Sequence, residues 1–391
     1  MNGRRTFGIV APMTEASWRR IRYALVAAFA LGYVWWFFSR GIIINHVLVL
    51  SSVALFFAIA TVGHPPRRWL RSLGDFGLFA AMWLGYAESR GVADRLGFPI
   101  QVESVRNIDR ALFFGRDGVV QLQEWFQSPA GTVRWYDVVG SMIYYSHFIV
   151  PPVTIAVLWF LNRTQWLRYM RRFATLLFIA CVMFVVVPTA PPWMAGDPRF
   201  GYDALPPLRR TTGNGWRHIG LDAAVDAWDT GRDWANAVAA MPSLHSAFSC
   251  FFVVFLFRWV TDWRLRALML LYPASMAVTL MYFGEHYFAD ALAGWAIVAF
   301  SFFVWNRIER RWAGSDADTD TDTDTDEMAA DPSSVDASTV GASTVGASTV
   351  DASTVGAAAH PSEESEVRPS VDVQLDAGGE AGLVSTQERH D

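Results

Sequence analysis

A histidine and an aspartate near the end of the apolar part of the chain have the spacing of an activated nucleophile. His286 and Asp290 are four residues apart, and residues i and i+4 share one face of a helix. The carboxylate can accept the imidazole N–H, fix the tautomer and leave the other ring nitrogen to attack a substrate. The pair therefore predicts nucleophilic catalysis by His286, although the same spacing also occurs in hydrogen-bonded helix caps. Glu285 would face another side of the helix, so we leave it outside the catalytic set.

A second histidine lies in the segment Met241-Pro-Ser-Leu-His-Ser246. Pro242 suits the first turn of a helix, where no N–H is needed. The N–H groups of Ser243, Leu244 and His245 would then face outward, and a helix N-terminus favours a bound phosphate. His245 would be placed to protonate a leaving oxygen. Two histidines and an anion site together predict phosphoryl transfer.

Two further polar features accompany the histidines. The segment Pro188-Thr-Ala-Pro-Pro-Trp193 ends an apolar run, and counting the spans places it on the same membrane face as the two histidine segments. His147 precedes Pro151 in another apolar run. It either lines the substrate cavity or is a hydrogen-bonded residue in a proline-kinked helix.

Eight apolar segments are candidates for membrane-spanning helices, because a span needs about 20 mostly apolar residues. They predict an all-α, polytopic membrane bundle, in which the third segment is short. The segments are 23–39, 42–62, 73–88, 136–161, 173–188, 242–260, 266–283 and 287–306.

Arginine predicts the orientation of this bundle, because short cytoplasmic loops are enriched in basic residues. Five clusters fall on one side: Arg4 to Arg22, Arg67 to Arg71, Arg163 to Arg172, Arg258 to Arg266 and Arg307 to Arg311. We therefore expect a plasma-membrane protein with both termini in the cytoplasm. The long connections 89–135 and 189–241, and the active site, would lie on the outer face. The stretch 92–130 reads as interfacial helices or as a lid over a lipid cleft.

Composition excludes several classes of protein. Hydrophobic residues make up 52% of the 391 residues and charged residues 18%, which excludes a disordered or fibrous protein. All 32 basic residues are arginine, so lysine-dependent chemistry is excluded. Cys181 and Cys250 lie in apolar runs, which argues against a disulfide framework. We expect no cofactor, no metal and no nucleic-acid partner.

The last part of the chain has a different composition. Residues 1–312 contain 30 arginines and 19 acidic residues, whereas 313–391 contain 2 and 18. Asp-Thr alternation and a five-residue repeat follow, and such sequences have little to bury. We expect a disordered, acidic cytoplasmic tail over 313–391 without a catalytic part; a docking tail for a basic partner is the alternative.

At these motifs the chain resembles the type 2 phosphatidic acid phosphatase superfamily, and within it the inositol phosphorylceramide synthase branch. Pro242-Ser243-Leu244-His245-Ser246 is similar to the family's Pro-Ser-Gly-His motif, and Gly284, His286, Asp290 and Gly294 match its third motif. The resemblance implies a six-helix catalytic core, which we place in 73–312 after two extra helices in 1–72. It also implies that His286 is the nucleophile, Asp290 its orienting carboxylate and His245 the general acid.

Two departures concern the cations that hold phosphate. Thr279-Leu280 stands where the phosphatases have Ser-Arg, and Pro188–Trp193 stands where they have Lys-x6-Arg-Pro. Other cations should replace them, because phosphoryl transfer depends on charge stabilisation. The candidates are Arg199, Arg209, Arg210 and Arg217, or Arg134. Of these, Arg199 and Arg217 join Ser243, Leu244, Gly284 and His147 as expected substrate-binding residues.

The sequence thus predicts a metal-independent phosphotransferase that acts on a phospholipid at the outer leaflet. A lipid phosphate phosphatase, acting on phosphatidic acid or an isoprenoid phosphate, is the nearest alternative. A proton-coupled transporter bundle with a histidine relay and a plain membrane anchor for the tail are alternatives of other classes. The sequence does not give the oligomeric state.

Overall fold

The computed structural model describes residues 13–43, 45–92, 96–126, 129, 132–202, 204–232 and 238–327. Within these ranges all regular elements are helices, and isolated β-bridges are the only strand-like pairings. The all-α prediction is therefore confirmed. The helices that form the bundle are α1 (Glu15–Arg40), α2 (His46–Thr61), α3 (Pro66–Val92), α6 (Trp135–Leu161), α7 (Arg163–Val186), α11 (Leu244–Leu256), α12 (Trp263–Met269), α13 (Leu271–Tyr282) and α14 (Phe288–Glu327).

Among the described residues, five helical stretches are long and apolar enough to cross a membrane: α1, α6, α7, the α12–α13 run (Trp263–Tyr282) and the Phe288–Trp312 part of α14. The helices at the second and sixth predicted spans, α2 and α11, are apolar but shorter. The third predicted span lies within α3, a helix of 27 residues that carries Arg67, Arg68 and Arg71 in its first turns. The chain is an integral membrane bundle.

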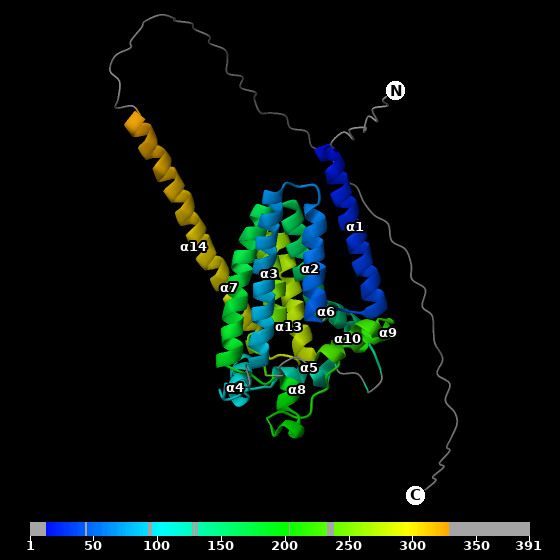
Figure 1. Cartoon of the computed structure of the whole chain (residues 1–391). Helices are drawn as coiled ribbons and strands as arrows, with labels where there is room; N and C mark the ends of the chain where they lie inside the picture. Colours follow the sequence, from blue (N-terminus) through cyan, green and yellow to red (C-terminus); the bar gives the residue numbers. More distant parts are fainter. Residues whose placement is uncertain are drawn as a thin grey trace, which may run out of the picture. The chain divides into compact units, whose positions relative to one another are not determined.

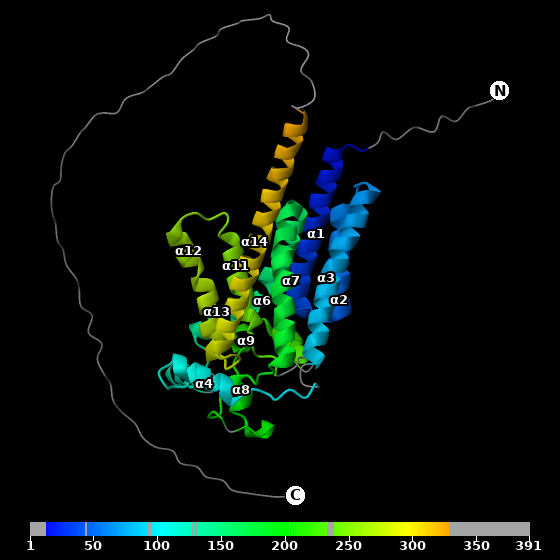
Figure 2. The same cartoon turned by 90° about the vertical axis from the view of Figure 1, so that its left-hand side faces the viewer.

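The long helices pack side by side (Figures 1 and 2), and α7 contacts α3, α6, α11 and α14. Aromatic residues fill the contact between α7 and α11: the Tyr169 ring meets the Phe251 ring edge-on at 4.8 Å. Trp166, Leu176 and Phe251 are fully buried. A dense apolar interior of this kind fixes the relative position of the helices that carry the site.

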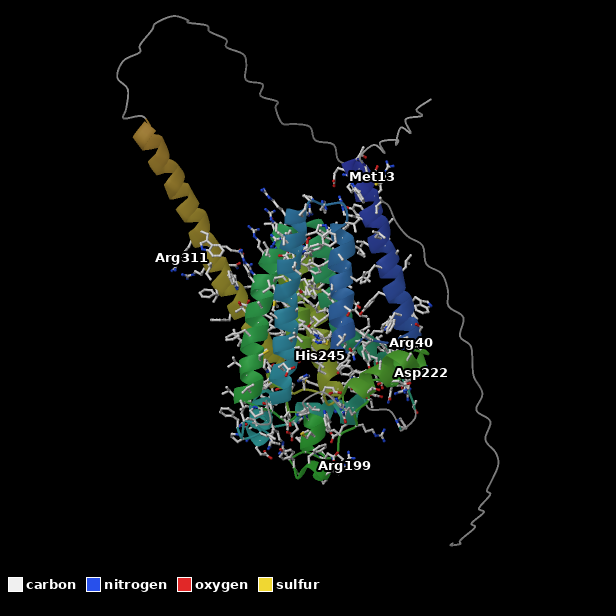
Figure 3. All side chains as sticks on the ribbon, in the orientation of Figure 1. Met13, Arg40, Arg199, Asp222, His245 and Arg311 are labelled. Atoms are coloured by element: carbon white, nitrogen blue, oxygen red, sulfur yellow. The ribbon has the colours of Figure 1, made fainter. Side chains whose placement is uncertain are left out.

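The two ends of the bundle differ in what they present (Figure 3). Met13 and Arg311 lie at one end, and Arg199 lies at the opposite end. Near the first end, the buried guanidinium of Arg172 donates to both carboxylate oxygens of Glu309, at 2.9 and 2.8 Å, and so joins α7 to α14. The other end gathers the short helices α4, α5 and α8 (Figures 1 and 2).

The first long connection packs against the helices of the bundle. Helix α4 (Glu103–Leu112) contacts α14, and helix α5 (Gly118–Phe126) contacts α13. Val105 and Val119 are buried there with Met281, Tyr287 and Ala289. The connection therefore forms a base under the start of α14.

The second long connection contains α8 (Pro192–Ala195), the 3-10 turn η1 (Pro198–Phe200), α9 (Asn214–His218) and α10 (Asp222–Arg232).

The last helix, α14, runs to Glu327. It therefore extends past residue 313, where we expected the tail to begin. The remaining part of the expected tail, 328–391, lies outside the described residues.

Candidate active site

The predicted nucleophile contacts its predicted carboxylate. The Nδ1 atom of His286 lies 3.2 Å from the Oδ2 atom of Asp290, and both side chains are buried. The Tyr287 N–H donates to the same Oδ2 atom at 3.0 Å. Asp290 is therefore held by the backbone in the position where it meets the imidazole.

His286 and Asp290 were expected to lie on one face of the same helix, and this is wrong. The helix α14 begins at Phe288, so His286 lies in the preceding loop and only Asp290 is helical. Gly284 has a φ of +71°, a left-handed conformation that glycine adopts without strain. This turn ends the α13 segment and brings the His286 ring back over the first turn of α14.

The helix that carries His245 begins later than predicted. Ser243 is the N-cap of α11 and its hydroxyl accepts the Ser246 N–H at 3.4 Å, so Pro242 lies outside the helix. The Ser243 N–H does not face outward as predicted, because it donates to the Asp290 carbonyl at 3.0 Å. Leu244 is buried at the first helical position. The two histidine segments are thus joined directly, backbone to backbone.

The two predicted catalytic imidazoles lie close together. The ring centres of His245 and His286 are 5.8 Å apart, with an angle of 57° between the planes. His245 is sandwiched between His147, at 4.0 Å, and Tyr144, at 4.6 Å. The structure therefore brings His147 into contact with His245; that His147 touches substrate stays a prediction.

The proline-rich segment is hydrogen-bonded to the segments that precede both histidines. The Thr189 N–H donates to the Val238 carbonyl at 2.6 Å, and the Ala240 N–H donates back to the Thr189 carbonyl at 3.3 Å. The Trp193 N–H donates to the Gly284 carbonyl at 3.0 Å. All three segments that the sequence singled out meet at one place, and Gly284 contributes its backbone there.

The expected phosphate-binding arginines occupy different surroundings. Arg199 is largely exposed and forms a forked ion pair with Asp197. Arg217 donates to Asp226 and Asp229, at 2.8 Å each. Both guanidinium groups are thus paired with carboxylates of the same connection, and their roles in substrate binding stay predictions.

Arg210 contacts the residue next to the nucleophile. Its Nε and Nη2 atoms donate to the two carboxylate oxygens of Glu285, at 2.6 and 2.8 Å, and Thr212 donates to the same carboxylate. Burial lowers the pKa of Arg210, but the charge of Glu285 and its hydrogen bonds outweigh this and hold the pKa above its ordinary value. Sequence reasoning left Glu285 aside because it was expected to face another side of the helix. Its pairing with Arg210 spans 75 positions, and no local pattern marks such a pair.

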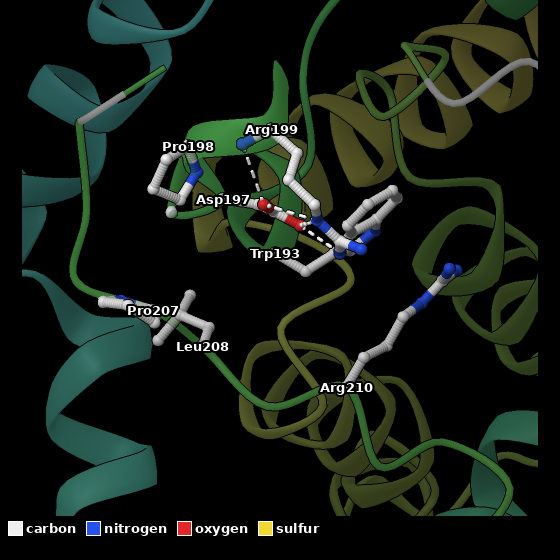
Figure 4. A pocket seen from close by; sticks show the side chains of 8 residues that line it. Trp193, Asp197, Pro198, Arg199, Pro207, Leu208 and Arg210 are labelled. Carbon is white, nitrogen blue, oxygen red and sulfur yellow. Dashed lines mark hydrogen bonds and ion pairs between the residues drawn. The ribbon is translucent and has the colours of Figure 1, made fainter. Parts of the chain in front are cut away.

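A pocket opens beside this pair (Figure 4). Its volume is about 530 Å³. The Arg210 guanidinium lies 4.6 Å from the centre of the Trp193 ring, a cation–π contact. The lining residues are Trp193, Gly196, Asp197, Pro198, Arg199, Pro207, Leu208 and Arg210.

Sequence reasoning also missed Asp109 in α4. Its Oδ1 atom accepts the Ala289 N–H at 2.9 Å, so it caps the start of α14 next to Asp290. Burial raises the pKa of Asp109 to about 6, and the nearby charge of Asp290 adds to this effect. The amphipathic pattern of α4 gave no sign that this acidic residue is buried.

Metal binding has no obvious donor set in the ranges that the structure describes, because no group of three or more His, Cys, Asp or Glu side chains is arranged to hold an ion. Metal independence stays a prediction.

The family model of the PAP2 superfamily matches residues 103–304, which is just over half of the chain and includes the proline-rich segment and both histidine segments. The chain belongs to the PAP2 superfamily. The resemblance inferred from the motifs is confirmed, and the chain is a membrane-type PAP2 enzyme.

The PAP2 chain is also similar to a curated bacterial protein. It is 28% identical over 280 residues to a phosphoinositol dihydroceramide synthase of Bacteroides thetaiotaomicron, an alignment that covers 69% of this chain and 87% of that protein. This likeness is consistent with the inositol phosphorylceramide synthase-like branch. No solved structure matches the chain.

Proposed function

We propose that this PAP2 enzyme is a phosphotransferase that acts on a phospholipid through a covalent phosphohistidine. The observation that carries the proposal is the contact between His286 and Asp290 at 3.2 Å, with the His245 ring centre 5.8 Å from that of His286. Because Nδ1 faces the carboxylate, Nε2 of His286 is the atom left to attack phosphorus. Asp290 stabilises the positive charge that the ring acquires.

The reaction then has two halves. In the first, Nε2 of His286 forms a bond to phosphorus, the bond from phosphorus to the lipid oxygen breaks, and His245 gives its proton to that oxygen. In the second, an acceptor hydroxyl gives its proton to His245, its oxygen bonds to phosphorus, and the P–N bond breaks. Proton transfer by a placed imidazole contributes typically 10² to 10⁴ in rate.

The acceptor decides the name of the activity. The curated relative is named as a phosphoinositol dihydroceramide synthase, which supports a phosphoinositol lipid as donor and a lipid alcohol as acceptor. Water as acceptor would make the same chemistry a lipid phosphate phosphatase. The acceptor requires no change in the roles of His286, Asp290 and His245.

We place the chemistry on the outer face of the plasma membrane. The arginine-rich loops support this orientation, since Met13 and Arg311 share one end of the bundle and Arg199 lies at the other (Figure 3). In this proposal 1–72 and 313–391 are accessory to the catalytic core. The family match begins at residue 103 and ends at residue 304, which is consistent with that division.

A product assay tests the proposal. The purified protein in detergent receives phosphatidylinositol labelled in the inositol, or phosphatidic acid labelled in the phosphate, each with and without a ceramide. We expect labelled inositol phosphate on the ceramide, and the His286→Ala variant should lose the product entirely. Release of labelled inorganic phosphate instead would favour the phosphatase, and undiminished turnover by His286→Ala would contradict the mechanism. Detergent also removes any ion gradient, so turnover there counts against the transporter alternative.

A further inference from the structure

We propose that Arg210, buttressed by Glu285, is the cation that binds the lipid phosphate, and that the pocket at Trp193 takes the polar headgroup. The inference rests on the proposed function and adds the binding subsite to it. It fills a gap in the motifs, because Lys-x6-Arg-Pro and Ser-Arg are both absent from their usual places in this chain.

The position of Arg210 is the first argument. Its guanidinium is forked onto Glu285, and the next residue along the chain is His286. Arg210 is thus tied to the residue next to His286, although it belongs to a loop far from that histidine in sequence.

The open edge of the guanidinium is the second argument. Arginine carries five N–H donors in a rigid fork, and Glu285 takes two of them. Among the described residues, the Arg210 guanidinium donates a hydrogen bond to no other acceptor. The remaining donors are available to a phosphate oxygen, and Trp193 fixes the plane of the group from one face at 4.6 Å. Pairing with a buried carboxylate pre-orients the fork, so less side-chain entropy is lost when the anion binds.

Arg199 and Arg217, the two arginines expected to bind substrate, are paired elsewhere. The side chain of Arg199 is 84% exposed, and its guanidinium is paired with the Asp197 carboxylate. The guanidinium of Arg217 donates to Asp226 and Asp229. Arg210 is the candidate that both lines the pocket and contacts the neighbour of the nucleophile.

The pocket indicates what the phosphate carries. Its walls combine an aromatic face, two guanidinium groups and the Asp197 carboxylate, which suits a hydroxyl-rich, water-soluble group better than an acyl chain. Its volume of about 530 Å³ is in the range of small-ligand sites. A phosphodiester with a polyol headgroup would place its phosphate on Arg210 and the polyol beside Trp193.

Binding measurements in the His286→Ala background test the subsite without turnover. The full-length protein in detergent is titrated calorimetrically with glycerophosphoinositol, with inorganic phosphate and with myo-inositol. Losing hydrogen bonds to a charged group should weaken binding about 10- to 100-fold. We expect Arg210→Gln to produce this loss for the two phosphate-bearing ligands and to leave the weak binding of myo-inositol unchanged.

Arg116→Gln is the matched control, because it removes one exposed arginine whose side chain donates to Gln121 and is not part of the pocket lining. It should bind all three ligands as the background does. If Arg210→Gln fails to fold, Arg210→Lys carries the test: lysine keeps the charge but loses the fork, and we expect a smaller loss, about 3- to 10-fold. Binding of glycerophosphoinositol and phosphate that is unchanged in the folded Arg210 variants would overturn the assignment.

Activity separates this inference from the proposed function. In the otherwise unmodified protein, Arg210→Gln should lower kcat/KM for phosphatidylinositol mainly by raising KM. If no lipid phosphate is turned over by any form of the protein while Arg210→Gln still weakens phosphate binding, the proposed function fails and the subsite stands. If turnover proceeds and Arg210→Gln behaves as Arg116→Gln in both assays, the subsite fails and the proposed function stands.

Discussion

Replacing Asp290 in two steps separates its charge from its hydrogen bonds. The Oδ2 atom of Asp290 accepts from Tyr287 N–H at 3.0 Å and lies 3.2 Å from Nδ1 of His286. In Asp290→Asn the backbone donor can only be met by the amide oxygen, so the asparagine orientation is fixed. The amide oxygen then still accepts the His286 Nδ1–H and preserves the tautomer, while the negative charge is lost.

The magnitude follows from that comparison. A hydrogen bond to a charged group contributes about 1.5–3 kcal/mol and a neutral one about 0.5–1.5 kcal/mol, so the charge accounts for about 1–2 kcal/mol in the transition state. We expect kcat for Asp290→Asn to fall about 5- to 30-fold. Asp290→Ala also frees the ring and leaves the Tyr287 N–H without its acceptor, and we expect a fall of about 10³-fold.

The assay is initial rate against phosphatidylinositol concentration in mixed micelles, with thermal unfolding as the control for folding. Asp290→Asn should be at least as stable as the parent, because the nearby Asp109 carboxyl no longer faces a second charge. An Asp290→Ala variant that is folded and as active as the parent would refute the role of Asp290. So would an asparagine variant less active than the alanine variant, since the fixed tautomer would then have no value.

Three further predictions concern stability, packing and metals. The pKa of Asp109 is raised from 3.8 to about 6, so folding takes up a proton between these pH values. The stability that this group contributes is therefore greatest at low pH and is lost as the pH rises through 6, and Asp109→Asn should remove this pH-dependent component, about 2–3 kcal/mol at most. If the change in melting temperature between pH 4.5 and 7.5 is the same for both proteins, the prediction is contradicted. A Cβ at Gly294 would lie 2.7 Å from the Ser243 carbonyl oxygen, so Gly294→Ala should lower the free energy of unfolding by about 1–3 kcal/mol and lower kcat by shifting the start of α11. Gly85→Ala is the control, because a Cβ there has open space around it, and it should change neither quantity. Equal melting temperatures and rates for the two variants would count against the close packing. Activity should survive dialysis against EDTA, and a loss that a divalent ion restores would show that the reaction needs a metal.

The sequence predicted the apolar helices and the three polar segments well, because both signals are local. Hydropathy over about 20 residues located the spans, and the four-residue spacing of His286 and Asp290 anticipated a real contact. The way the contact is made was missed, because Gly284 ends the helix and the spacing alone cannot show that the histidine precedes the next one. Likewise Pro242 was placed in a helix that begins at Leu244.

The parts that could not be predicted depend on tertiary contacts. Arg210 meets Glu285 across 75 positions, and Asp109 meets Ala289 across 180. Neither partner is marked by its neighbours in sequence, and one arginine among several in a loop looks like any other until the fold sets it beside a carboxylate. The stack of His147 on His245 belongs to the same class, since it requires α6 and α11 to be adjacent.

The most direct test of the account is to trap the covalent intermediate. The protein is mixed with phosphatidylinositol labelled in its phosphate, quenched in denaturant within milliseconds, and digested for mass spectrometry. We predict acid-labile label on the peptide that contains His286, and no label in His286→Gln, which should be inactive. Label on another residue, or turnover retained by His286→Gln, would contradict the claim that this imidazole attacks phosphorus.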